Sequence, residues 1–358
     1  MEGSPIDIVI FAALAPMFGV LLFWFIQLLF IESQKFLLQK IRAKHKPLIR
    51  FTNYLGILFQ TICHALGYTV TKSGISEFYI SVNYGKVAPK KIKKGIFEWI
   101  SNAFLFIGPF FIPAFLLLIC IFFLVPNSFQ IIVPENILNL KYTFGGQIII
   151  FGTSLYEFTL KFLGFLGSID LLHPGHFAFL ILMIFLGLGM RPTYIGEKKP
   201  DKVNMIYDLK NIWLLIRHKP LYLIILFSIA YMFFYISLYL NQDWYVMIFI
   251  LLGWISIISI TSLFISHLII LLIKTTDEIP KYWKIMPYLM LPLSYILMRL
   301  FFYYFPIIFS KTISLIIMLI STTVVLYILL IYKSDKFKTI REMKLLKKKT
   351  QGGADEQQ

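Results

Sequence analysis

The apolar positions of this chain gather into long runs that are separated by short polar stretches. A helix that crosses a bilayer needs about 20 consecutive apolar residues, whereas a membrane β-barrel shows ~10-residue alternating segments. The pattern therefore predicts an all-α polytopic membrane protein, with about seven to nine transmembrane helices by the length criterion. The predicted spans are residues 8–31, 96–125, 171–190, 221–240, 244–273, 286–309 and 312–332.

Residues 32–50 differ from these runs because they are basic and amphipathic. Leu37, Leu38 and Ile41 follow helical spacing among charged side chains, which predicts a helix lying on a membrane surface. The basic residues of the segment are Lys35, Lys40, Arg42, Lys44, Lys46 and Arg50.

For two further helical segments the sequence does not decide whether they cross the membrane. Residues 51–68 form a short second helix that Asn53 and Gln60 interrupt, and basic segments flank it on both sides. Cytoplasmic loops are enriched in Lys and Arg, so this helix is either re-entrant or has one external basic flank. Residues 147–167 are only moderately apolar, and the pattern fits an in-plane helix as well as a full span.

Along residues 75–87 the pattern of side chains repeats every two residues. Phe78, Ile80, Val82 and Tyr84 share one face, which predicts a strand. Backbone groups of a strand cannot remain unpaired in lipid, so we expect a small β element at the membrane surface after the second helix.

Composition and charge agree with a membrane class. The chain is 58% hydrophobic and 15% charged, with a net charge of +16. The lysines lie in loops between apolar runs, which is typical of the positive-inside rule and places the 191–219 loop and the C-terminal tail in the cytoplasm. No basic domain stands apart from the membrane segments, so we expect the lipid bilayer, and no nucleic acid, as a partner.

The pattern divides the chain into four parts. Residues 1–50 hold the first span and the basic amphipathic segment, 51–215 a membrane core, 216–332 a four-helix transmembrane bundle, and 333–358 a basic tail with a disordered end. We find no internal repeat, which argues against an inverted-repeat transporter.

Several polar residues fall within apolar runs, where they are functional-site hypotheses by default. Cys63 and His64 are adjacent on a helix and point about 100° apart, so they do not face one metal. We expect Cys63 to serve helix packing and His64 to hydrogen-bond to a neighbouring helix. His267 and Arg299 should likewise face the bundle interior and find polar partners.

The turn His173-Pro174-Gly175-His176 is a weak candidate for a metal site, because Asp170 precedes its two histidines. His64, His173 and His176 are thus the candidate metal ligands among the histidines. Histidines in loops near a membrane surface are common, so the alternative interpretation is an ordinary turn.

Residues 50–215 resemble the site-2 protease family of intramembrane zinc metalloproteases. The likeness rests on QTICH at Gln60–His64 in place of HExxH, then Gly74, the strand, and the glycine Gly85. It continues with a Gly108-Pro109 pair, MRP at Met190–Pro192 and DLKN at Asp208–Asn211.

The resemblance implies that the catalytic site is degenerate. HExxH places two zinc ligands and a general base on one helix face. Here Gln60 and Thr61 replace the first histidine and the glutamate, and only His64 remains. Asp208 stands at the position of a third ligand. We therefore expect no catalytic residue and no cofactor, with zinc only if the site is functional.

Three functions remain at this point. The first is a catalytically inactive scaffold, or a regulatory or substrate-binding subunit, whose strand holds another membrane protein or a peptide segment by β-addition. The second is an active zinc metalloprotease with an atypical site. The third is a transporter or channel whose polar residues line a path.

Overall fold

A computed structural model describes the backbone of residues 6–82, 84–125, 143–190, 205–280 and 282–352. Seven of the described helices are long and apolar enough to cross a membrane, which confirms an all-α polytopic membrane protein. These are α1 (Ala12–Ile41), α3 (Ile96–Leu124), α4 (Phe144–Gly167), α7 (Pro220–Tyr239), α8 (Trp244–Thr276), α9 (Met286–Tyr304) and the Ser310–Tyr332 part of α10 (Ser310–Gly352).

The predicted surface helix at 32–50 is wrong. Helix α1, which follows a π-helical turn at Asp7–Phe11, continues through Gln34 to Ile41, and α2 (Lys46–Val70) begins only after a turn. Gln34, Leu38 and Ile41 are buried, so this apolar face packs inside the protein and not on lipid. Pro47 lies in the first turn of α2, where its missing N–H breaks no hydrogen bond.

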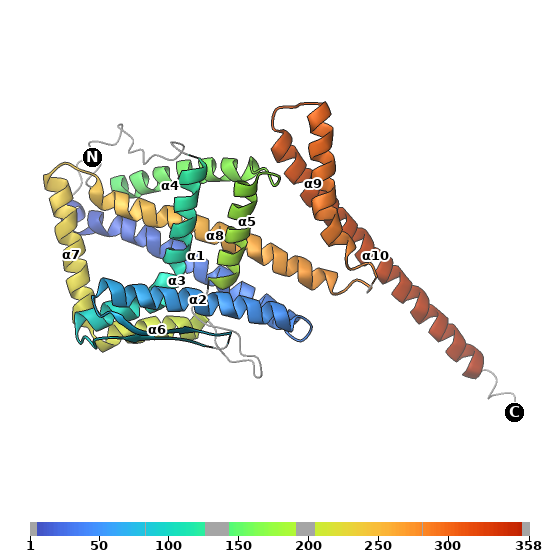
Figure 1. Cartoon of the computed structure of the whole chain (residues 1–358), viewed down its shortest axis with the longest axis horizontal. Coiled ribbons are helices and arrows are strands. Elements are labelled where there is room, and N and C mark those ends of the chain that lie inside the picture. The colour runs from blue at the N-terminus through green and yellow to red at the C-terminus, as the bar shows by residue number, and fades with distance from the viewer. Residues whose placement is uncertain (1–5, 83, 126–142, 191–204, 281, 353–358) are drawn as a thin grey trace. The chain divides into compact units, whose positions relative to one another are not determined.

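The predicted single strand is a hairpin. β1 (Ile75–Ile80) pairs antiparallel with β2 (Gly85–Pro89), and Phe78 opposes Val87. Ser81 N donates to Tyr84 O over 2.9 Å and closes the turn. The reversal lets β1 pair the backbone groups along one of its edges within the chain, which one extended strand could not do. The small β element that the sequence predicted after the second helix is thus present (Figure 1).

One predicted span is shorter in the structure, and one segment of open placement has the length of a span. α5 (Pro174–Gly189) has 16 residues, which is shorter than the ~20 that cross a bilayer. Residues 147–167 belong to α4, which has the length and hydropathy of a span. The chain also forms α6 (Met205–His218) within the segment that the sequence assigns to a polar loop.

The chain forms two compact units. One contains residues 1–165 and 171–270, and the other contains residues 166–170 and 271–358. Helix α7 and most of α8 thus share a unit with the 51–215 region, whereas the sequence pattern grouped them with α9 and α10. The four-part division of the chain stays a prediction.

Small residues permit close helix packing in the first unit. A Cβ on Gly187 of α5 would lie 2.1 Å from the Ser262 carbonyl oxygen of α8. A Cβ on Gly19 of α1 would lie 2.3 Å from the Phe151 ring of α4. In lipid no hydrophobic force drives helices together, so they associate through close van der Waals contacts. Small residues permit such contacts because they let the backbones approach.

α1 and α8 run parallel, and two pairs of residues that bond across them have the same separation in sequence. Gln34 Nε2 donates to Ser266 Oγ over 2.8 Å, and the Tyr245 hydroxyl donates to Ala13 O; both pairs are 232 residues apart. Gln34 Nε2 also donates to Gly187 O over 3.1 Å. In this register Gln27 lies level with Ser259 on α8. Gln27 is fully buried, and neither its Oε1 nor its Nε2 has a hydrogen-bond partner.

Gln27→Leu should therefore raise the free energy of unfolding by about 1–2 kcal/mol, because it removes an unsatisfied buried amide. Gln34→Leu should lower it by about 0.6–1.7 kcal/mol for each of the two interhelical hydrogen bonds that it deletes. Reversible unfolding in mixed micelles measures both variants. Effects of the same sign would contradict this assignment of the two glutamines.

The second unit contains a partly buried ion pair. Arg299 Nη2 of α9 lies 2.9 Å from Asp170 Oδ2, and Tyr295 donates its hydroxyl hydrogen to Asp170 Oδ1 over 3.1 Å. Lys311 Nζ lies 4.0 Å from the same carboxylate. The prediction that Arg299 finds a polar partner is confirmed.

Candidate functional site

The residues of the degenerate motif lie in the second half of α2, where the hairpin packs on the helix. Thr61 is buried, and its hydroxyl donates to Ile57 O over 2.6 Å. A Cβ on Gly85 of β2 would lie 2.0 Å from Thr61 Oγ1, so the hairpin backbone rests directly on this side chain. Gly85 is thus required for a close approach of strand and helix. Gln60 is half-buried beside it.

Helix α3 closes the other side of α2. A Cβ on Gly108 would lie 2.9 Å from Cys63 Cβ, and a Cβ on Gly67 would lie 2.9 Å from Phe104 Cβ. Cys63 is buried and unbridged, so its predicted role in helix packing is confirmed. Gly108 of α3 and Gly85 of the hairpin therefore both pack against the same turn of α2.

His64 does not make the predicted hydrogen bond to a neighbouring helix. Its buried Nε2 has no partner, and its ring lies against the Tyr68 ring with 4.4 Å between centroids. The physical reason is the helical period, which puts Tyr68 one turn along the same face. We expected His267 on α8 to bond to a polar partner. Its buried Nδ1 has no hydrogen-bond partner.

The candidate metal ligands do not converge. His173 Nδ1 accepts from His176 N over 3.4 Å at the start of α5, which makes His173 a helix cap. Asp170 is bound to Arg299 instead. The side chain of Asp208 lies outside the described residues. Among the side chains that the structure describes, no three His, Cys, Asp or Glu are grouped as metal ligands.

The edge of β1 that faces away from β2 is a free strand edge. Hydrogen-bonded and non-hydrogen-bonded pairs alternate along an antiparallel ladder, and Ser81 bonds to Tyr84. The N–H groups of Phe78 and Ile80 therefore face away from β2. In the described part of the chain no third strand joins β1.

One ion pair crosses the hairpin. Lys86 Nζ lies 2.7 Å from Glu77 Oε2, and both side chains are exposed. The hydrogen bond to Glu77, together with the charge of that carboxylate, raises the pKa of Lys86 above its ordinary value. This pair neutralises the charge of Glu77 on β1.

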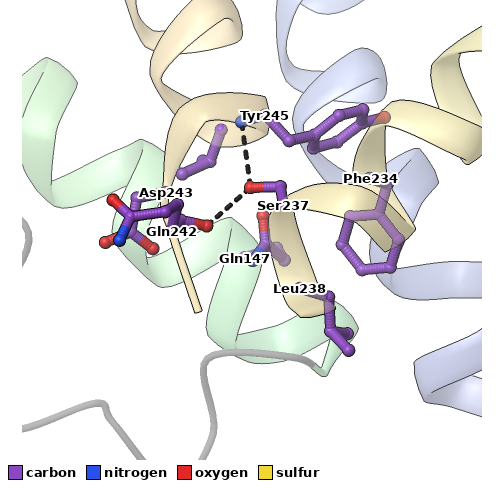
Figure 2. A pocket seen from close by; sticks show the side chains of 8 residues that line it. Gln147, Phe234, Ser237, Leu238, Gln242, Asp243 and Tyr245 are labelled. Carbon is purple, nitrogen blue, oxygen red and sulfur yellow. Dashed lines mark hydrogen bonds between the residues drawn. The ribbon is translucent and has the colours of Figure 1, made fainter. Parts of the chain in front are cut away.

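A small cavity lies elsewhere in the first unit, at the turn between α7 and α8 (Figure 2). Its volume is about 10 Å³, which is room for about one water molecule. Ser237 Oγ donates to Gln242 O over 2.5 Å and accepts from Tyr245 N over 3.4 Å. Sequence reasoning missed Ser237, whose only signal is one small polar residue in an apolar run. None of the lining residues belongs to the degenerate motif.

No protein-family model, no curated protein and no solved structure matches this chain.

Proposed function

We propose that this integral membrane protein is a catalytically inactive relative of the site-2 proteases that holds a membrane-associated peptide segment along β1. The packing of Gly85 on Thr61 carries the proposal. This contact brings the hairpin against α2, and the resemblance assigns both elements to one site. The residue contacted, Thr61, stands where the protease motif has its general base.

The chemistry of that position supports a role without catalysis. Threonine is not a general base near neutral pH, because its hydroxyl does not ionise there. The Thr61 hydroxyl also donates its hydrogen to Ile57 O and lies against the hairpin backbone. Gln60 replaces one of the two helix ligands, and an amide oxygen is a poor ligand for zinc.

The free edge of β1 supports peptide binding. Unpaired N–H and C=O groups on a strand edge bind an extended peptide through main-chain hydrogen bonds. Phe78 and Tyr79 are about half exposed beside this edge and could contact alternate side chains of the peptide. We also infer, from the positive-inside pattern, that the C-terminal tail lies in the cytoplasm.

A photo-reactive amino acid at Tyr79, irradiated in native membranes, tests the proposal. We expect crosslinks to an intact polypeptide in the otherwise unchanged protein. Phe78→Pro should abolish them, because it removes an outward N–H while leaving the hydrogen bonds to β2 in place. Phe78→Thr is the matched control, since it changes the side chain and keeps the N–H.

Two results would contradict the proposal. Crosslinks that survive Phe78→Pro would show that β1 does not hold the partner. Cleaved partner fragments that disappear in His64→Ala, together with bound zinc that the same change removes, would favour an active metalloprotease with an atypical site.

A further inference from the structure

Lysines from two separate segments meet at the base of the hairpin. Lys72 lies in the turn after α2, and Lys90 and Lys91 follow β2. Lys90 N donates to Gly74 O over 3.1 Å, and Lys91 N donates to Ser73 O over 3.0 Å. These bonds hold the two segments side by side, and all three lysine side chains are exposed.

The acids of this region are already paired. Glu77 binds Lys86, and Glu98 lies 3.6 Å from Lys219. Lys93 is also engaged, because its Nζ donates to Thr71 O over 2.6 Å. In the part of the chain that the structure describes, Lys72, Lys90, Lys91 and Lys94 make no ion pair. We name these four residues the lysine cluster.

The lysine cluster lies next to a membrane-crossing segment. Lys94 comes two residues before Ile96, where the candidate span α3 begins. Ile92 stands between the lysines and is 83% exposed, and Phe97 on the first turn of α3 is 47% exposed. Basic side chains that surround an exposed apolar residue at this level match the boundary between headgroups and acyl chains.

We propose that the lysine cluster binds the phosphate-bearing headgroups of anionic phospholipids, with Ile92 inserted at the interface. Each lysine near an anionic membrane surface contributes about 1 kcal/mol, or about fivefold in affinity. The site is assembled by the fold, since the bonds at Gly74 and Ser73 bring Lys72 to residues 18 positions away. The proposal does not depend on peptide binding at β1 or on the protease resemblance.

The full-length protein in nanodiscs of phosphatidylcholine, with and without phosphatidylglycerol, provides the test. Native mass spectrometry counts the phosphatidylglycerol molecules that remain bound after mild delipidation. The cluster variant carries Lys72→Gln, Lys90→Gln and Lys91→Gln. The control carries Lys86→Gln, Lys219→Gln and Lys284→Gln, which remove the same total charge from lysines that are ion-paired.

We expect the cluster variant to bind phosphatidylglycerol at least about tenfold more weakly, and the control to change by less than about twofold. High salt should reduce binding to the unchanged protein, because the Debye length shortens. Equal losses in both variants would overturn the proposal, since they would reflect net charge alone. Displacement of the lipid by inorganic phosphate would also overturn it, because the cluster would then bind free anions. Far-UV circular dichroism verifies that both variants are folded.

Discussion

Gly187→Ala is expected to lower the free energy of unfolding of the first unit by about 2–3 kcal/mol, because it overpacks the contact between α5 and α8. The new Cβ would lie 2.1 Å from the Ser262 carbonyl oxygen and 2.5 Å from Ser266 Oγ. The first of these is backbone and cannot rotate away, so the helices must separate. Their separation would also weaken the bond from Gln34 to Gly187 O.

Unfolding in mixed micelles, followed by far-UV circular dichroism, measures this loss. Gly152→Ala is the matched control, because no atom lies within 4 Å of its added Cβ. Alanine favours a helix over glycine by up to about 1 kcal/mol, so this control should be neutral or stabilising. If both substitutions destabilise the protein equally, the close packing of α5 on α8 is not the cause.

Arg299→Leu should destabilise the second unit by about 2–3 kcal/mol, since it leaves the Asp170 carboxylate without its closest cation. Removing one partner of a buried ion pair costs about 3–5 kcal/mol. We expect less here, because Lys311 lies 4.0 Å away and both side chains of the pair are partly exposed, at 21% and 14%.

The double variant Arg299→Leu/Asp170→Leu separates this effect from lost packing. It should recover most of the stability, because the partly buried Asp170 carboxylate no longer remains without its cation. Trp283 is the one tryptophan in this unit's sequence, so its fluorescence follows unfolding once the other five tryptophans are replaced by phenylalanine. Additive losses in the double variant would mean that the pair does not stabilise the unit.

The membrane class and most of the helices follow from the sequence alone. Runs such as 96–125 and 221–240 become α3 and α7 almost residue for residue, because burial in lipid depends only on local apolar content. The ends of helices are less predictable. The pattern ended the first span near residue 31, whereas α1 continues to Ile41 because its later turns pack on other helices.

The candidate site was predictable as a set of positions, but its contacts were not. The order of Gln60–His64, the strand, Gly85 and Gly108 is present in the sequence, and these elements do meet around one turn of α2. The tilted contact between the His64 and Tyr68 rings and the capping role of His173 depend on side-chain directions that residue spacing does not specify.

The sequence by itself determined that this chain belongs in a membrane and where most of its long apolar helices lie, and it predicted that Gln60 and Thr61 supply neither an imidazole ligand nor a general base. These properties depend on composition, hydropathy and residue identity. Only the tertiary structure decided that Gly85 rests on Thr61, that Arg299 pairs with Asp170, and that Lys90 and Lys91 bond to the turn that follows α2. These contacts join residues 16 to 129 positions apart, and local patterns carry no information about which distant segments pack together.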